Sequence, residues 1–185
     1  EKTNNIAAIS SYDGTSNILI SEDFNIDDDT LNFNQITNYN NGIQLLSLSW
    51  HESKLLVDGV DHQGRKIFYV NQDNGTLEPI KNDYEKFENR DQHTAYLSGL
   101  VYTTDQSGIN NLILNNGTTS NYITNVYGGA FMPCVSKGGK ILYSLYENGK
   151  YNIAILDNLD KVDISNVGYS QNYFLNHNIS ELILD

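Results

Sequence analysis

Two clusters of acidic side chains in the sequence could bind metal ions, and each has a simpler structural explanation. Asp27 to Asp29 in "NIDDDT" could supply oxygen ligands for Ca²⁺, but they lack the regular spacing and the distal Glu of a calcium-binding loop. Asp58, Asp61 and His62 in "DGVDHQG" could form a metal pocket, but turn chemistry explains a stretch that contains Asp and Gly. We therefore expect a solvated insertion and a turn, and no cofactor or metal.

Nucleophilic catalysis would need a Ser or Cys beside a base and an orienting partner. Ser98 in "YLSGL" is not part of a Gly-x-Ser-x-Gly elbow and fits a turn between two strands. Cys134, the single cysteine, is interpreted as a small buried hydrophobe. The histidines are scattered, and we expect them to be solvated: His51, His62, His93 and His177. The sequence predicts no enzyme activity.

The overall composition restricts the class of protein further. The chain has 185 residues, 39% of them hydrophobic and 18% charged, which is enough apolar material for a packed core. Its formal net charge of −12 would repel phosphate backbones, so no nucleic-acid partner is expected. No apolar run approaches the roughly 18 residues of a membrane-spanning helix. Because the first residue is Glu1, we interpret the chain as a processed or excised piece of a longer one.

Hydrophobic patterning indicates strands rather than helices. Thirteen Tyr residues against two Pro, together with many β-branched side chains, favour β-structure. Gly, Asn and Asp lie between the apolar runs, where tight turns need them. No apolar stripe of helical period extends over three turns, so the chain is expected to be all-β.

An internal repeat is visible when the chain is aligned with itself. "GLVYTT" from Gly99 and "KILYSL" from Lys140 match at a shift of 41, which continues through the turn glycines Gly108 and Gly149. "ITNYNNG" from Ile36 and "ITNVYGG" from Ile123 match at a shift of 87, about two periods. Each period of about 41–45 residues has room for four short strands joined by hairpins.

A four-stranded antiparallel meander of this length is the unit of a β-propeller blade. We therefore predict propeller blades over about four periods, as an incomplete segment of a larger propeller; the alternative is a small ring closed by pairing of the terminal strands. The predicted blades cover residues 1–38, 39–80, 81–124 and 125–166, and residues 167–185 start the next.

The repeat resembles that of TolB-like propellers. "VSKGGKILYSLYENGKYNIAILD" is similar to a repeat that runs Ser-Pro-Asp-Gly-Lys-x-Leu-Ala-Tyr, a turn with Gly, then Ile-Tyr-x-x-Asp, and the Ile-Thr-Asn ends also match. Ser136 to Gly139 lacks the Pro-Asp pair, so the copies are degenerate. The resemblance implies a bacterial envelope, periplasmic protein, in which such propellers accompany outer-membrane barrels or peptidase domains.

Propellers usually bind through one face of the ring, built from the connections between blades and the turns between second and third strands. We expect a non-catalytic module that binds a protein or peptide, with a companion domain of the same chain as one option. The alternative is an accessory propeller that positions substrate for a peptidase domain. A sugar-binding or lyase propeller ranks last, because the chain has two arginines. The candidate contact residues are Tyr39, His62, Tyr84, Asp105, Gln106 and Tyr127.

Overall fold

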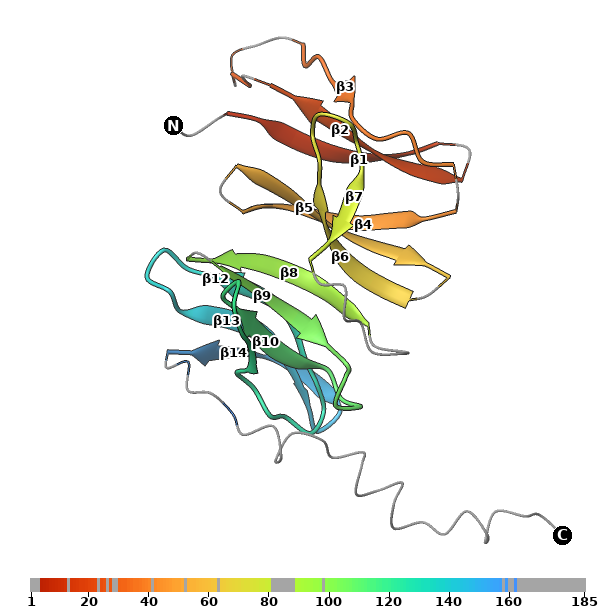
Figure 1. The fold of residues 1–185 in the computed structure, drawn as a ribbon. Coiled ribbons are helices and arrows are strands. Elements are labelled where there is room, and N and C mark those ends of the chain that lie inside the picture. The colour runs from red at the N-terminus through yellow and green to blue at the C-terminus, as the bar shows by residue number, and fades with distance from the viewer. Residues whose placement is uncertain are drawn as a thin grey trace, which may run out of the picture. The chain divides into compact units, whose positions relative to one another are not determined.

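The chain folds entirely into β-structure over its described part. The computed structural model describes residues 4–157, 159 and 162, apart from positions 13, 23, 26, 28–29, 41, 52, 63, 81–88 and 98. These residues form fourteen strands and no helix (Figure 1). They divide into two compact units, residues 1–87 and 88–185, each with its own core. The predicted all-β class is confirmed.

The first unit contains two antiparallel sheets. The three-stranded sheet consists of β1 (Ile6–Tyr12), β2 (Thr15–Ser21) and β3 (Asn34–Gln35). The four-stranded sheet consists of β4 (Gln44–His51), β5 (Lys54–Asp61), β6 (Gly64–Val70) and β7 (Leu77–Pro79). In both sheets each strand pairs with the next strand in the sequence, so each sheet is a meander (Figure 1).

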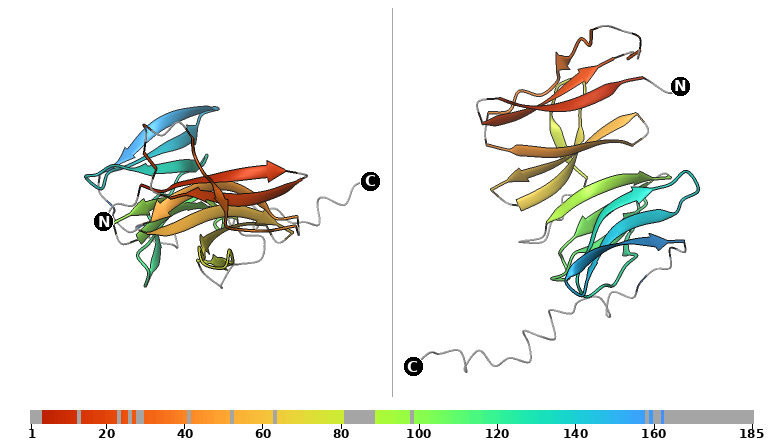
Figure 2. Two further views of the ribbon diagram at one scale, coloured as in Figure 1. Left: turned by 90° about the horizontal axis from the view of Figure 1, so that it is seen from above. Right: turned by 180° about the vertical axis from the view of Figure 1, so that it is seen from behind.

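The second unit also contains two antiparallel meanders, with the four-stranded sheet first in the sequence. Its four-stranded sheet consists of β8 (Arg90–Tyr96), β9 (Gly99–Thr104), β10 (Asn111–Asn115) and β11 (Ser120–Tyr122). Its three-stranded sheet consists of β12 (Ala130–Val135), β13 (Ile141–Glu147) and β14 (Lys150–Leu156). Among the described residues β14 is an edge strand of this sheet, and it is the blue arrow in both views of Figure 2.

The strand pairing shows the repeat that the sequence predicts. In one sheet Leu112 lies opposite Thr103, and in the last sheet Ile153 lies opposite Ser144. Both partners are displaced by 41 residues, so the two hairpins have the same register. The hairpin between β13 and β14 turns at Asn148 and Gly149, whose φ angles are 52° and 78°. Positive φ at both central residues is the geometry that an Asn-Gly turn favours.

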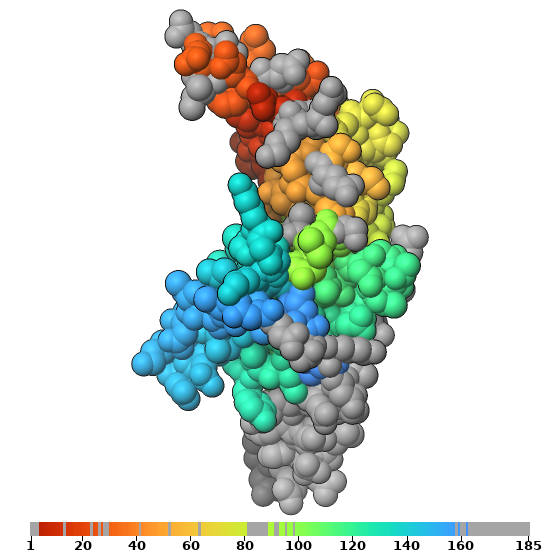
Figure 3. Space-filling view, turned by 90° about the vertical axis from the view of Figure 1, so that its left-hand side faces the viewer, coloured from red at the N-terminus to blue at the C-terminus, as the bar shows by residue number. Residues whose placement is uncertain are grey.

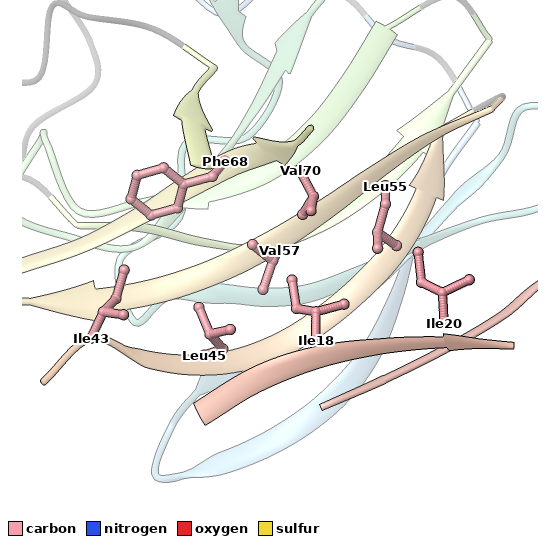
Figure 4. Close-up of a cluster of buried hydrophobic side chains, with 8 residues drawn as sticks. All are labelled: Ile18, Ile20, Ile43, Leu45, Leu55, Val57, Phe68 and Val70. Carbon is pink, nitrogen blue, oxygen red and sulfur yellow. The ribbon is translucent and has the colours of Figure 1, made fainter. Parts of the chain in front are cut away.

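The core of the first unit lies between its two sheets. Ile18 and Ile20 of β2 point toward the sheet of β4, β5 and β6, as Figure 4 shows. There they meet side chains such as Leu55 and Val57, and all four residues are at most 2% exposed. Burying an aliphatic side chain of this size stabilises a fold by about 1.5–3 kcal/mol. Sheet-on-sheet packing therefore supplies the main stabilisation of this unit.

The second unit has a core of the same kind. Val101 of β9 and Leu112 of β10 pack with Ala130 of β12 and Ile141 of β13, and each of these four side chains is fully buried. Tyr143 of β13 belongs to the same cluster, and its burial raises the pKa of its hydroxyl. Strand β9 is buried along its whole length, which explains why its apolar run is continuous rather than alternating.

Candidate binding face

A buried asparagine fixes the two loops that carry three of the predicted contact residues. Asn111 is 1% exposed and begins β10. Its Oδ1 accepts hydrogen bonds from the Thr124 hydroxyl at 3.0 Å and the Val126 N–H at 3.1 Å. Its Nδ2 donates to the Ser107 hydroxyl and the Ile109 carbonyl, both at 3.4 Å. The β9–β10 turn and the connection from β11 to β12 are therefore joined through one side chain.

The first unit contains the same network at the matching positions. Thr37 donates from its hydroxyl to Oδ1 of Asn17 at 3.0 Å, and the Tyr39 N–H donates to the same atom at 2.7 Å. The Ile18 N–H donates to Thr37 Oγ1 at 2.8 Å, as the Leu112 N–H donates to Thr124 Oγ1 at 2.8 Å. Each repeated Ile-Thr-Asn segment follows the last strand of a sheet, and its Thr is hydrogen-bonded to an Asn of that same sheet. We call this hydrogen-bonded pair the Asn–Thr clamp.

The clamp supports a first prediction. Replacing Asn111 with alanine leaves the buried Thr124 hydroxyl and the Val126 N–H without their acceptor. Because an unsatisfied buried polar group costs about 1–3 kcal/mol, we expect the free energy of unfolding to fall by about 2–3 kcal/mol. Urea denaturation followed by circular dichroism measures this loss.

Asn38→Ala is the matched control, because Asn38 is an exposed asparagine beside the equivalent clamp of the first unit. A surface change of this kind alters stability by about 0.5 kcal/mol or less. Equal losses in the two variants would contradict a structural role for the clamp.

Asp105 and Gln106 lie in the β9–β10 turn and differ in their surroundings. The Asp105 carboxylate accepts from the Asn89 N–H at 2.6 Å and from its side-chain amide at 2.7 Å. The Asp105 carbonyl accepts from the Gly108 N–H at 2.7 Å, which closes the turn. Gln106 is exposed, and its Oε1 accepts from the Tyr122 hydroxyl at 3.4 Å. Asp105 therefore shapes the turn, while Gln106 presents its side chain to solvent.

Tyr127 projects from the connection between β11 and β12, and its side chain is 83% exposed. The backbone beneath it is held tightly against β13. The Tyr146 N–H donates to the Gly129 carbonyl at 2.9 Å, and a Cβ placed on Gly128 would lie 1.9 Å from the Tyr146 carbonyl oxygen. The Ala130 N–H donates to the Asn110 carbonyl at 2.8 Å, beside the β9–β10 turn. The structure therefore brings Gln106 and Tyr127 onto adjoining, rigid loops.

The other predicted contact residues belong to the first unit or fall outside the described residues. The Tyr39 hydroxyl donates to the Gly75 carbonyl at 3.1 Å and accepts from the Leu77 N–H at 3.0 Å. Both of its hydrogen-bonding functions are thus used within the fold. His62 is exposed in the β5–β6 turn. Tyr84 lies outside the described residues.

Three sequence interpretations of reactive side chains need correction. Cys134 is exposed rather than buried, because it lies on the outer face of β12 opposite Leu142. His51, at the end of β4, and His93, within β8, are each 9% exposed rather than solvated. The remaining predictions on Ser98 and His177 lie outside the described residues.

The structure describes Asp27, Asp58 and Asp61 of the two acidic stretches, whereas Asp28 and Asp29 lie outside the described residues. Asp58 is a buried residue of β5 whose carboxylate accepts from the Ser47 hydroxyl at 2.5 Å. Asp61 ends β5, 3.7 Å from the ammonium group of Lys66. Asp27 lies between β2 and β3, where its N–H donates to the Asn25 side chain. Across the residues that the structure describes, no three His, Cys, Asp or Glu side chains gather as a metal-binding group.

The membrane prediction can be checked over the same residues. Within the described ranges there is no helix with the length and apolar character needed to cross a bilayer.

Neither a protein-family model nor a curated protein sequence matches the chain. Solved structures do. TolB from Acinetobacter baumannii superposes with a TM-score of 0.63 at 17% identity, over 85% of this chain and 39% of that one. The chain has the fold of a TolB-like β-propeller. A candidate TolB from Agrobacterium tumefaciens gives a TM-score of 0.58 at 15% identity, over 82% of this chain and 56% of that one.

The TolB-like fold is shared with an enzyme. Puromycin hydrolase gives a TM-score of 0.60 at 8% identity, over 82% of this chain and 23% of that one. The chain spans 39% and 56% of the TolB chains that it matches. The resemblance predicted from the repeat is confirmed at the level of the fold.

Proposed function

We propose that this TolB-like propeller segment is a non-catalytic binding module of a bacterial envelope protein, and that its partner is a protein or peptide. The observation that carries the proposal is the pairing of exposed side chains with rigid backbone. Gln106 and Tyr127 face solvent from loops that Asn111 and Gly128 fix in place. A rigid loop that presents an aromatic side chain loses little conformational entropy on binding.

The predicted contact residues then take different roles. Tyr127, Gln106 and, in the first unit, His62 are the proposed contacts, because their side chains are exposed. Tyr39 and Asp105 are proposed to position loops, because their polar atoms already bond within the fold. A net charge of −12 disfavours phosphate-rich partners and is compatible with a protein partner.

The proposal is tested by affinity capture from an envelope extract, followed by titration of the captured partner. Replacing both Gln106 and Tyr127 with alanine is expected to weaken binding about 30-fold, since an aromatic hot spot contributes about 2 kcal/mol or more. Leu97→Ala is the matched control: Leu97 is 77% exposed in the β8–β9 turn, at the other end of β9.

A partner that binds wild type and both variants equally would contradict the assigned face. The non-catalytic part of the proposal has its own test, which is incubation of the purified chain with a panel of peptides. We expect no cleavage, and cleavage that survives further purification would overturn this part.

A second function is favoured by the likeness to puromycin hydrolase, which is an enzyme with the same fold over this region. The propeller would then position substrate for a catalytic domain of the same parent protein. In that case the double variant at Gln106 and Tyr127 would change the KM of the parent protein's hydrolysis while leaving kcat unchanged.

A further inference from the structure

Four Asn-Gly pairs occur in the sequence, and the structure describes both residues in three of them: Asn74–Gly75, Asn116–Gly117 and Asn148–Gly149. Because glycine has no Cβ, its backbone nitrogen can closely approach the side-chain carbonyl carbon of the preceding asparagine. Attack at that carbon forms a five-membered succinimide ring and releases ammonia. The three pairs can therefore be compared by how freely the glycine nitrogen and the asparagine side chain can move.

In the Asn74 turn both reacting groups are held. The Gly75 N–H donates to the Asn71 carbonyl at 2.8 Å. The Asn74 Oδ1 accepts from the Thr76 N–H at 3.0 Å and from the Thr76 hydroxyl at 2.7 Å. Gly75 is also buried, and a Cβ placed on it would lie 2.2 Å from the Ile36 carbonyl oxygen. The nitrogen and the carbonyl carbon can meet in this turn only after these hydrogen bonds break.

In the Asn116 turn both groups are held as well. The Gly117 N–H donates to the Asn115 Oδ1 at 2.7 Å. The Asn116 Oδ1 accepts from the backbone N–H groups of Thr118 at 3.1 Å and Thr119 at 2.8 Å. It also accepts from the hydroxyls of these two residues, at 2.9 Å and 3.2 Å. Asn116 and Gly117 are exposed, but hydrogen bonds fix the nitrogen and the side chain in place.

The Asn148 turn leaves both groups free. Asn148 and Gly149 are exposed, and beyond the adjoining residues no atom lies within 4 Å of a Cβ placed on Gly149. Among the residues that the structure describes, no hydrogen bond involves the Asn148 side chain or the Gly149 N–H. The turn is closed instead by the pairing of Glu147 with Lys150 on its two sides. Figure 3 shows this segment in blue at the surface of the molecule.

We propose that Asn148 is a modification site, at which the chain converts its own asparagine to isoaspartate and aspartate. Hydroxide removes the proton of the Gly149 nitrogen, which bonds to the Asn148 Cγ. The Asn148 Nδ2 takes a proton from water and leaves as ammonia, so hydroxide is regenerated. Water then opens the succinimide, at Cγ to give aspartate or at the backbone carbonyl carbon to give isoaspartate. The net change replaces NH2 by OH, and nothing is oxidised or reduced.

Isoaspartate would alter the hairpin that contains it, because its main chain runs through Cβ and Cγ and is one atom longer. The turn between Glu147 and Lys150 has the two-residue form that fits a pair of antiparallel strands. Next to this turn, the Tyr146 N–H donates to the Gly129 carbonyl at 2.9 Å. A longer turn is therefore expected to loosen Tyr146 from the connection that carries Tyr127. The inference is independent of partner binding at the loops.

Incubation of the full chain in mildly alkaline buffer, followed by trypsin digestion and mass spectrometry, tests the proposal. Cleavage after Lys140 and Lys150 yields a peptide whose only asparagine is Asn148, so the replacement is assigned directly. We expect Asn148 to convert about tenfold faster than Asn74 or Asn116, because one hydrogen bond that must break first slows a reaction by about this factor. Equal rates at the three sites, or a slower rate at Asn148, would overturn the proposal.

Two controls separate the effect of structure from that of local sequence. In urea the unfolded chain should convert the three asparagines at similar rates, and a lead of Asn148 that persisted there would contradict the structural explanation. Asn115→Ala removes the acceptor of the Gly117 N–H. This variant should convert Asn116 several-fold faster and Asn148 at the wild-type rate. An unchanged rate at Asn116 would contradict the role assigned to this hydrogen bond.

The effect on the hairpin is measured by amide hydrogen exchange in the isoaspartate form, separated by chromatography. The Tyr146 amide should exchange about tenfold faster than in the unmodified chain, as for the loss of one hydrogen bond. The Ala130 amide, which donates to the Asn110 carbonyl, is the comparison and should keep its rate. Unchanged exchange at Tyr146 would show that the turn absorbs the extra atom and would overturn this part of the inference.

Discussion

Leu112→Ala is expected to lower the free energy of unfolding by about 4 kcal/mol. Leu112 is fully buried where the sheet of β8 to β11 meets the sheet of β12 to β14. Removing a buried leucine side chain costs about 2–5 kcal/mol, through lost transfer free energy and the cavity that remains. Val101 and Ile141, also fully buried, belong to strands fixed by their own pairing, so the site has little freedom to collapse. Urea denaturation measures the loss.

Leu46→Ala is the matched control, since Leu46 is a strand leucine that is 49% exposed. Its substitution should cost about 1 kcal/mol or less. If the two leucine variants were equally stable, the sheets of the second unit would not be packed through Leu112, and the blade interpretation of this unit would fail.

The second large effect is expected at Gly128. A Cβ at this position would lie 1.9 Å from the Tyr146 carbonyl oxygen and 2.9 Å from the carbonyl carbon. Neither atom belongs to a flexible side chain, so the loop or β13 must shift. Forcing extra atoms into a packed site typically costs about 1–3 kcal/mol, and we expect Gly128→Ala to reach the upper end, about 3 kcal/mol. The shift would also displace Tyr127 and weaken partner binding.

Gly138→Ala provides the comparison. Gly138 lies in the turn between β12 and β13, and the nearest atom to a Cβ there is the Ser136 hydroxyl oxygen at 4.0 Å. This variant should keep both its stability and its partner binding. A Gly128→Ala variant that unfolds and binds like wild type would show that the connection is not held against β13.

Much of the fold could be predicted from the order of apolar runs and turn residues. The hairpin at Asn148 and Gly149 follows from local chemistry, because an Asn-Gly pair favours the positive φ angles that a two-residue hairpin needs. The shift of 41 between Leu112 and Ile153 follows from the repeat and appears unchanged in the strand register. This arrangement of strands could therefore be predicted from local signals that recur at a fixed period.

The Asn–Thr clamp could not be predicted from single residues, because its partners are far apart in the chain. Asn111 and Thr124 are 13 residues apart, while Asn17 and Thr37 are 20 residues apart. Asn is abundant throughout the sequence, and nothing local separates a clamping Asn from a turn-forming one. The available signal was that Asn17 and Asn111 each lie in a strand that precedes an Ile-Thr-Asn segment.

The candidate site was predictable as a set of loops, but the roles of its residues were not. Tyr39 was expected to be a contact residue, and the structure uses its hydroxyl to join Gly75 and Leu77. Cys134 was expected inside the core, and the β-bulge between Phe131 and Cys134 accompanies its exposed position. The exposure of Cys134 depends on which side of the strand faces a neighbour, and a one-residue irregularity reverses that side.

The most direct test of the repeated, face-packed sheets is nuclear magnetic resonance of the methyl groups in the second unit. Nuclear Overhauser effects are expected between methyl protons of Leu112 and Val101 on one sheet and those of Ala130 and Ile141 on the next, because all four are fully buried in one cluster. Their absence, with Leu112 methyl groups coupled only to residues of β8 to β11, would contradict blade packing.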